Sequence, residues 1–170
     1  MFTLIIGGAA SGKSEYAEAL VMAQPEPRLY IATMQPYDDE CVARISRHRA
    51  MRAQKGFTTV ERYTSLAGAA LPVGGSALLE DLSNLLANEL YSPEGRGAGQ
   101  VMAGIEAVLD LSANLTVVTN EVFSGGAAYS EETLRFLQEL AGLNRALAAR
   151  ADNVIEVVCG FPNVLKGVGR

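Results

Sequence analysis

The sequence of 170 residues predicts an α/β fold in which helices flank a mostly parallel central sheet. Short β-branched or apolar runs of strand length alternate with segments whose apolar residues recur at helical spacing. Several runs are apolar throughout, as expected for strands buried on both faces of a parallel sheet. About half of the sequence is hydrophobic (49%), and no internal repeat or long linker interrupts it. One compact domain over residues 1–170 is therefore expected.

The first part of the chain supplies the expected elements in alternating order. Residues 2–6 (FTLII) stop at glycines and suit a buried strand, and residues 13–23 carry helix formers until QPEP ends the helix. RLYIAT at 28–33 predicts a second strand. Residues 38–54 begin with acids and continue into arginines, the order that complements a helix dipole. FTTVERY at 57–63 predicts a third strand.

The second part continues the alternation as far as a final strand. Its expected elements are, in order, a connection or short helix in SLAGAALPVGG, an apolar run SALLEDL that ends in acids, helices at 82–90 and 101–111 divided by a turn, a buried strand at 115–122, a long amphipathic helix at 131–150 and a last strand at 153–160. This order fits a layered fold with short connections.

Composition narrows the classes of partner and compartment. The net charge of −5 gives no reason to expect binding to nucleic acid or to an anionic membrane surface. Cys41 and Cys159 lie too far apart for a paired metal-ligand or redox motif, and reduced thiols fit a cytoplasmic protein. No run approaches the length of a membrane span, and the amino terminus lacks the pattern of a secretory leader. We expect a cytoplasmic protein without a membrane span.

The strongest chemical motif follows the first strand, where Gly7, Gly12, Lys13 and Ser14 complete the pattern G-x-x-x-x-G-K-[ST]. Backbone N–H groups of such a loop surround phosphate oxygens, and the next helix adds its positive end. Lys13 is expected to reach the terminal phosphates, and the Ser14 hydroxyl to bind a magnesium ion that bridges them. The candidate nucleotide-binding residues here are Gly7, Gly8, Ala9, Ala10, Ser11, Gly12, Lys13 and Ser14. The predicted fold is therefore that of a P-loop NTPase of the RecA-like layered type.

Two carboxylates follow the apolar run SALL. Glu80 or Asp81, at the end of a strand, could hold Mg²⁺ or its water shell. Alternatively, the pair simply complements the dipole of the following helix. The sequence does not decide which of the two carboxylates faces the metal.

The only histidine, His48, lies among arginines. On a helix, Arg44, His48 and Arg52 share one face at i, i+4 spacing, with Arg47 alongside, and such a face suits phosphate oxygens. Neighbouring positive charge favours the neutral imidazole, which could attack a nucleotide α-phosphate. A surface histidine on a solvated basic helix is the alternative.

These motifs resemble the bifunctional adenosylcobinamide kinase and adenosylcobinamide-phosphate guanylyltransferase family of cobalamin biosynthesis, nearly from end to end. GGAASGKS stands for the family's GGARSGKS, YIAT is retained, and DDECVARISRHRAMR follows the pattern DDEM..RI..H...R. Phe57, Thr59 and Glu61 represent the W.T.E element. LLEDLSNLLANEL represents LL.D.LT....NLL with Glu80 at the acidic position. VTNEV and GLNRALAARADNVIEVVCG resemble the closing strand, helix and strand.

The resemblance implies a chemistry in two steps. A nucleoside triphosphate, ATP or GTP, phosphorylates adenosylcobinamide with Mg²⁺, and GMP is then transferred from GTP through a guanylylated histidine, giving adenosylcobinamide-GDP. It places His48 on that histidine, gives Lys13 a role in both activities, and implies nucleotide contacts by Thr33, Arg52, Glu61 and Glu80. Ser14 and Glu80 are the expected metal ligands. A homo-oligomer, a symmetric trimer in similar proteins, is also implied.

The sequence departs from the family in several places, and other functions stay open. FSGGAAYS at 123–130 replaces a loop that contains glycine and proline, and Ala10, Phe57 and Asp81 replace an arginine, a tryptophan and a cysteine. One alternative is a P-loop kinase for another small metabolite, in which His48 takes no part. A second is a nucleotide-dependent switch. A third is a diverged GTP-binding relative that has lost one activity.

Overall fold

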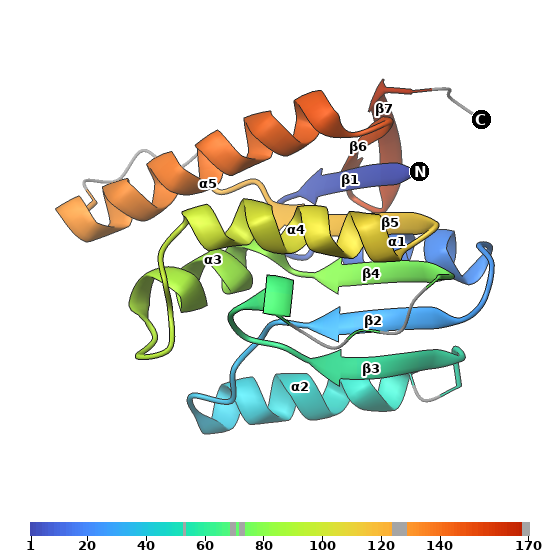
Figure 1. Ribbon diagram of the computed structural model, residues 1–170, viewed down its shortest axis with the longest axis horizontal. Coiled ribbons are helices and arrows are strands. Elements are labelled where there is room, and N and C mark those ends of the chain that lie inside the picture. The colour runs from blue at the N-terminus through green and yellow to red at the C-terminus, as the bar shows by residue number, and fades with distance from the viewer. Residues whose placement is uncertain (53, 69–70, 72–73, 124–128, 168–170) are drawn as a thin grey trace.

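The computed structural model describes residues 1–52, 54–68, 71, 74–123 and 129–167. Strands and helices alternate along most of the chain (Figure 1). The elements are β1 (Phe2–Gly7), α1 (Lys13–Met22), β2 (Arg28–Ala32), α2 (Asp39–Arg52), β3 (Phe57–Glu61), the 3₁₀ helix η1 (Leu66–Gly68), β4 (Ser76–Glu80), α3 (Leu82–Tyr91), α4 (Gly99–Leu111), β5 (Asn114–Asn120), α5 (Glu131–Arg150), β6 (Asn153–Val158) and β7 (Phe161–Lys166). The expected α/β alternation is confirmed, with bounds that differ by a few residues.

The described residues form a sheet of seven strands, in the order β3-β2-β4-β5-β1-β6-β7. The first six strands are parallel to one another. The register places Gly7 beside Asn120, and Ala32 between Glu61 and Glu80. Because the carboxyl ends of parallel strands share an edge, these residues meet at the edge where such folds bind ligands.

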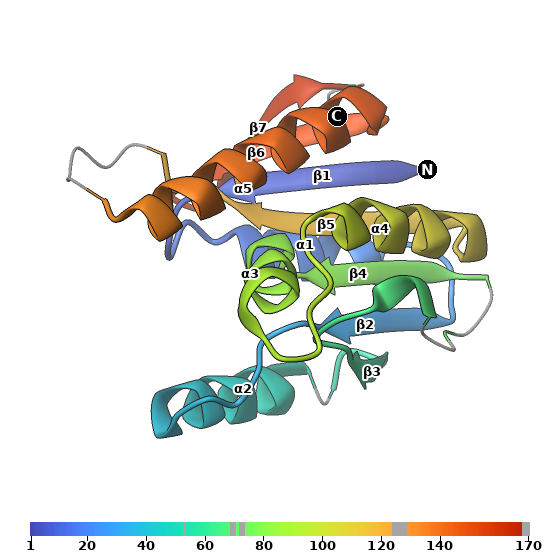
Figure 2. The same ribbon diagram turned by 60° about the vertical axis from the view of Figure 1, so that its left-hand side comes forward.

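The helices cover both faces of the sheet, and apolar side chains of alternating strand positions fill the space between them. On one face, strand residues such as Leu4 and Leu79 pack with α3, α4 and α5 (Figure 2). On the other face, Ile5, Tyr30 and Leu78 pack with α1. The strands are therefore buried on both sides, as the continuous apolar runs predicted.

The expectation that the strand at 153–160 is the last one is wrong. β6 ends at Val158, and β7 pairs with it in antiparallel orientation at the edge of the sheet. Cys159 and Gly160 form the turn with φ of 51° and 81°, the left-handed conformation that a tight hairpin requires at both central residues. This strand was not predicted from the sequence, because it contains Pro162 and all of its side chains are exposed, features that are tolerated only at the edge of a sheet.

Candidate functional site: the phosphate cleft

The loop between β1 and α1 has the geometry of a phosphate cradle. Gly12 precedes α1 with φ of 88°, a conformation that favours glycine. A Cβ added at Gly7 would lie 2.5 Å from Ser11 Oγ and 2.7 Å from the carbonyl oxygen of Val157. Both glycines of the motif therefore serve the close course of the loop, which leads into the amino-terminal end of α1.

Lys13 and Ser14 stand at the start of α1, beside the end of β4. The Lys13 Nζ donates a hydrogen bond of 3.1 Å to the carbonyl oxygen of Gly8. The Ser14 hydroxyl donates to Glu80 Oε1, and the Tyr30 hydroxyl donates to Glu80 Oε2 at 3.2 Å. Glu80 therefore joins the P-loop to β2 through one carboxylate.

Asp81, the next residue, has a different environment. Its Oδ1 accepts a 2.8 Å hydrogen bond from the Asn84 N–H, so Asp81 is the N-cap of α3. Its Oδ2 accepts from the Asn120 amide at 3.2 Å. The buried Thr33 hydroxyl donates to the carbonyl oxygen of Asp81 and accepts from its N–H, at 2.8 and 2.7 Å. The helix-capping role considered for the acidic pair thus applies to Asp81, while Glu80 faces the P-loop serine.

Burial changes the acidity of these groups. Desolvation raises the pKa of Glu80 to about 7, against the opposing hydrogen bond from Ser14. Burial also raises the pKa of Asp81, and the hydrogen bonds from Asn84 and Asn120 and the charge of Lys13 oppose it. Burial raises the pKa of Tyr30 as well, so its hydroxyl stays protonated and acts as the donor to Glu80. A cation bound here would compensate negative charge that the protein itself solvates poorly.

These residues enclose the phosphate cleft, a cavity of about 550 Å³. P-loop residues from Ala9 to Glu15 line it, together with Glu80, Asp81 and Asn120. Met34 and Asn84 line the cleft as well, and Arg47 of α2 contributes a wall apart from the P-loop. The cleft thus combines three carboxylates, those of Glu15, Glu80 and Asp81, with a lysine and an arginine.

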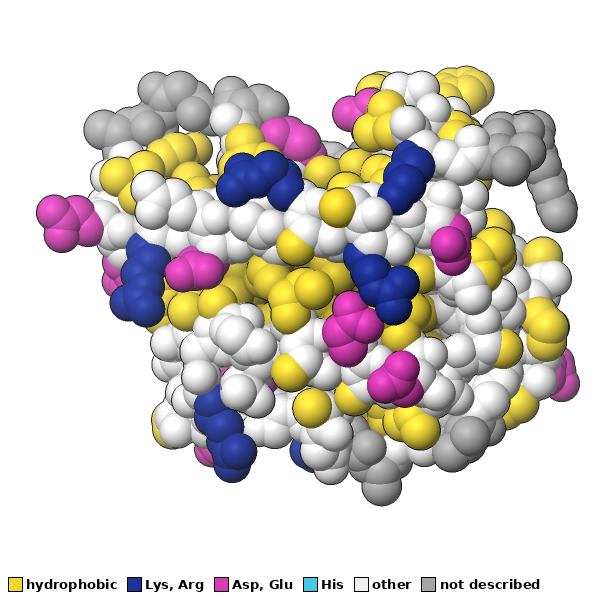
Figure 3. Space-filling view, turned by 45° about the horizontal axis from the view of Figure 1, so that its top comes forward, with side chains coloured by type: hydrophobic (Ala, Val, Ile, Leu, Met, Phe, Trp, Pro, Cys, Tyr) yellow, Lys and Arg dark blue, Asp and Glu magenta, His cyan; other side chains and the backbone are white. Residues whose placement is uncertain are grey.

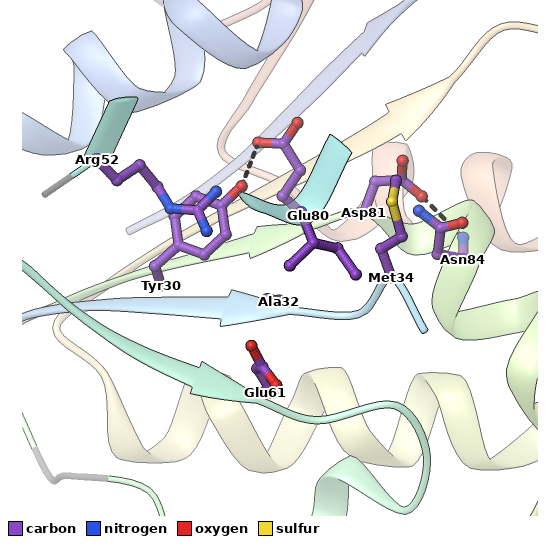
Figure 4. Close-up of a pocket in the computed structure, with 9 residues that line it drawn as sticks. Tyr30, Ala32, Met34, Arg52, Glu61, Glu80, Asp81 and Asn84 are labelled. Carbon is purple, nitrogen blue, oxygen red and sulfur yellow. Dashed lines mark hydrogen bonds between the residues drawn. The ribbon is translucent and has the colours of Figure 1, made fainter. Parts of the chain in front are cut away.

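A second, smaller cavity, shown in Figure 4, lies next to the cleft and shares Glu80 and Asp81 with it. The Arg52 guanidinium lies 3.6 Å from the centroid of the Tyr30 ring, an arrangement typical of a cation–π contact. Arg49 forms an ion pair with Glu61, whose side chain also lines this cavity. Of the predicted arginine face, Arg52 contacts Tyr30 of β2, and Arg47, expected alongside it, lines the cleft. Arg49, which was not part of that face, holds Glu61 of β3.

The structure brings most of the predicted site residues together. Ala9, Ala10, Ser11, Gly12, Lys13, Ser14 and Glu80 line the phosphate cleft, and Arg52 and Glu61 line the cavity next to it. Gly7 and Gly8 lie at the base of the loop, and Thr33 is not among the residues that line either cavity, because its hydroxyl is engaged by Asp81. His48 is part of α2, but its side chain and that of Arg44 are outside what the structure describes. So are residues 124–128 of the altered loop.

Some residues of the site were not predicted from the sequence. Asn120 ends β5 and donates hydrogen bonds to Asp81 and Ser83, while Tyr30 and Asn84 hold the two carboxylates. Asn120 had a usable signal, since it is a polar residue at the end of an apolar parallel strand that leads to the ligand edge. Tyr30 had no such signal, because a tyrosine within an apolar strand is expected to be a core residue.

On the face of the molecule that Figure 3 shows, basic and acidic side chains are interspersed. Within the described part of the chain, no helix combines the length and hydropathy needed to cross a membrane.

Comparison with known proteins identifies the family. A family model for cobinamide kinase / cobinamide phosphate guanyltransferase matches residues 3–165. The bifunctional adenosylcobalamin biosynthesis protein CobP of Pseudomonas aeruginosa is 36% identical and aligns over 98% of both chains. The CobU protein of Salmonella typhimurium is 34% identical, over 95% of this chain and 97% of that protein.

Solved structures agree on the fold. The flagellar accessory protein FlaH of Methanocaldococcus jannaschii superposes with a TM-score of 0.51 at 13% identity, over 98% of this chain and 78% of that one. An ATPase of a bacterial type III secretion system reaches 0.50 at 9% identity, over 96% of this chain and 56% of that one. Such low identities speak for the P-loop NTPase fold alone. By its sequence relatives, the chain belongs to the cobinamide kinase / cobinamide phosphate guanyltransferase family, a family of transferases.

Proposed function

We propose that the protein phosphorylates adenosylcobinamide with a nucleoside triphosphate and then converts the product to adenosylcobinamide-GDP with GTP, through a guanylylated His48. One observation carries this proposal: α2, the helix that contains His48, supplies one wall of the cleft whose other wall is the P-loop. Arg47, the residue before the histidine, lines that cleft together with Lys13. The nucleophile is thus carried by an element that already borders the triphosphate site.

In the kinase step, the acceptor hydroxyl attacks the γ-phosphorus, the bond to the bridging oxygen breaks, and the nucleoside diphosphate leaves as the hydroxyl proton is released. Lys13 and the backbone N–H groups of the P-loop stabilise the charge on the phosphate oxygens. Lys13 already lies within hydrogen-bond distance of the loop, held by the Gly8 carbonyl. It therefore needs little reorganisation to meet a phosphate.

In the transferase step, a neutral imidazole nitrogen of His48 attacks the α-phosphorus of GTP and pyrophosphate leaves. A phosphate oxygen of adenosylcobinamide phosphate then attacks the same phosphorus, and the bond to nitrogen breaks. The covalent intermediate divides one displacement into two. Arg47 supplies positive charge on the same wall of the cleft.

The donor atoms at the cleft fit Mg²⁺. Ser14 Oγ and the Glu80 carboxylate are hydrogen-bonded oxygen groups, and Mg²⁺ prefers oxygen ligands. Within the described residues, no group of three His, Cys, Asp or Glu side chains could hold a metal by itself. Nucleotide-bound Mg²⁺ needs only one or two protein ligands besides phosphate oxygens and water. When bound, it would neutralise charge that develops on the transferred phosphate.

The test is incubation with Mg²⁺ and GTP labelled at the α-phosphate, followed by mass measurement of the intact protein. We expect a GMP adduct that is labile in acid and stable in alkali, as a phosphoramidate is. His48→Ala should lack the adduct, and because the chain contains no other histidine, no second imidazole can take its place. An adduct of equal yield on His48→Ala would overturn the assignment.

The proposal also covers the oligomeric state and the cellular compartment of the protein. We expect a cytoplasmic homo-oligomer, with a symmetric trimer as the specific form. Light scattering after size-exclusion chromatography measures the number of subunits directly.

A further inference from the structure

A groove of about 380 Å³ runs along α3, next to the phosphate cleft. Met34, Gln35 and Tyr37, which follow β2, line one side, and Asn84, Ala87 and Tyr91 of α3 line the other. We call it the α3 groove. Met34 and Asn84 line the phosphate cleft as well, so the two hollows lie next to each other.

The α3 groove differs in chemistry from the cleft that it joins. The described side chains that line it are aromatic, aliphatic, thiol or amide groups, and none of them carries a full charge. The cleft beside it holds Lys13, Arg47, Glu80 and Asp81. A nucleotide triphosphate needs cations and backbone donors, so the α3 groove suits a different ligand, one with broad apolar surface and neutral polar groups.

The direction of phosphoryl transfer indicates what that ligand is. The terminal phosphates of a nucleotide would lie at Lys13 and Ser14, beside the carboxylates of Glu80 and Asp81. The attacking oxygen must approach opposite the leaving oxygen, hence from the side away from the P-loop. Met34 and Asn84 line the cleft without belonging to the P-loop, and both also line the α3 groove.

We propose that the α3 groove binds the corrinoid acceptor, with its hydroxyl arm directed past Met34 and Asn84 into the phosphate cleft. This inference rests on the proposed function and adds the acceptor site to it. A corrinoid is a broad macrocycle that bears neutral amide side chains. The rings of Tyr37 and Tyr91 offer it apolar surface, and the amides of Gln35 and Asn84 offer donors and acceptors of matching type.

The neighbouring surface provides room for a ligand wider than the groove. Ala87 and Tyr91 also line a further hollow of about 280 Å³, which reaches Thr133 and Phe136 of α5. Tyr37 and Tyr91 expose 68% and 47% of their surfaces, far more than core tyrosines such as Tyr30 at 2%. Exposed aromatic side chains on both sides of a hollow are typical of a ligand site.

The first test measures binding of adenosylcobinamide by spectroscopic titration, without nucleotide. Ala87→Arg places a charged side chain in the α3 groove and should weaken binding at least tenfold, and Tyr91→Ala should weaken it severalfold. Tyr91→Phe keeps the ring and should bind within about twofold of the wild type. Phe161→Ala removes an exposed aromatic ring from β7, outside the groove, and serves as the matched control. Equal affinity of Ala87→Arg and wild type would overturn the inference.

The second test uses the two free cysteines, of which Cys41 lines the α3 groove and Cys159 lies in the β6–β7 turn. Adenosylcobinamide should slow alkylation of Cys41 severalfold and leave Cys159 unaffected, and the protection should disappear in Ala87→Arg. A hydrogen bond with Asp38 raises the pKa of the Cys41 thiol, so labelling is followed at alkaline pH. Equal rates at Cys41 with and without corrinoid would count against the site.

Failure of this inference can be distinguished from failure of the proposed function. Adduct formation with GTP requires no acceptor. A wild-type protein that forms no GMP adduct contradicts the proposed function. A wild-type protein that forms the adduct and binds corrinoid, but whose Cys41 is unprotected and whose Ala87→Arg variant binds normally, contradicts only the acceptor site.

Discussion

The P-loop wall of the phosphate cleft and the α2 wall opposite it are held by different interactions. On the P-loop wall, Ser14, Tyr30 and Glu80 form one hydrogen-bonded chain, and Thr33 fixes the backbone of Asp81 from a fully buried position. The strands beneath them end in the apolar core. This wall is therefore formed before any nucleotide arrives.

The α2 wall has little apolar support. Among the α2 side chains that the structure describes, only that of Arg52 is buried, at 5% exposure. The helix is held near its carboxyl end by the Arg52–Tyr30 contact and the Arg49–Glu61 ion pair. The position of the phosphate cradle therefore depends on apolar packing and buried hydrogen bonds, whereas the position of the helix that carries His48 depends on contacts made by charged side chains.

The largest expected effect comes from the P-loop wall. Lys13→Ala removes the cation nearest the phosphates and should lower both the kinase rate and the rate of GMP-adduct formation by about 10²- to 10³-fold. Steady-state phosphorylation of adenosylcobinamide and the time course of adduct formation measure the two rates. Lys166→Ala, on the exposed β7, is the control. Rates within twofold of the wild type in both assays would remove Lys13 from the mechanism.

The pH dependence of the unfolding free energy tests the P-loop wall in a second way, through Glu80. The pKa of Glu80 is raised to about 7, above the ordinary value of 4.5. Below pH 4.5 both the folded and the unfolded state hold the proton, whereas above pH 7 both have lost it and the folded state bears the cost of a buried charge. Without nucleotide, the unfolding free energy of the wild type should thus fall by about 3 kcal/mol relative to Glu80→Gln across this window.

Urea unfolding at a series of pH values measures this difference. Glu80→Gln alters the hydrogen bonds with Ser14 and Tyr30 at every pH, so only the pH-dependent part reports the buried charge. Glu94→Gln, at an exposed carboxylate, gives the baseline. A difference between wild type and Glu80→Gln that stays constant from acid to neutral pH would show that Glu80 is well solvated.

A smaller effect is expected from the residue behind the P-loop wall. Thr33→Val keeps the shape of the side chain but leaves the Asp81 N–H without its partner, while the Asp81 carbonyl oxygen keeps only the hydrogen bond from the Leu85 N–H. An unpaired buried donor should lower the unfolding free energy by about 1.5 kcal/mol in urea titrations. Thr58→Val, at an exposed position of β3, should change it by less than about 0.5 kcal/mol. Equal values for the two variants would refute the buried role of Thr33.

The two walls also differ in how well the sequence predicts them. The P-loop can be predicted from the spacing of its glycines, lysine and serine. That Gly7, Glu80 and Asn120 lie close together can be predicted because parallel strands end at one edge of the sheet. Most helices and strands follow from periodicity, since the core occupies both faces of the sheet. The partners of Arg49 and Arg52 could not be predicted, because they depend on how α2 packs against β3 and β2, which helical spacing alone does not determine. β7 was not predicted either, because a strand exposed at the edge of the sheet lacks the apolar pattern of a buried strand.

The smallest expected effect tests the α2 wall. Arg49 and Glu61 keep 55% and 33% of their side-chain surface exposed, so solvent screens their attraction. A double-mutant cycle of Arg49→Gln and Glu61→Gln, measured by urea unfolding, should give a coupling of about 0.5 kcal/mol at low salt that largely disappears in 1 M salt. A coupling above about 2 kcal/mol that ignores salt would mean that this wall is as firmly built as the P-loop wall. A weak, salt-sensitive coupling would instead leave the Arg52–Tyr30 contact as the principal attachment of the helix that carries His48.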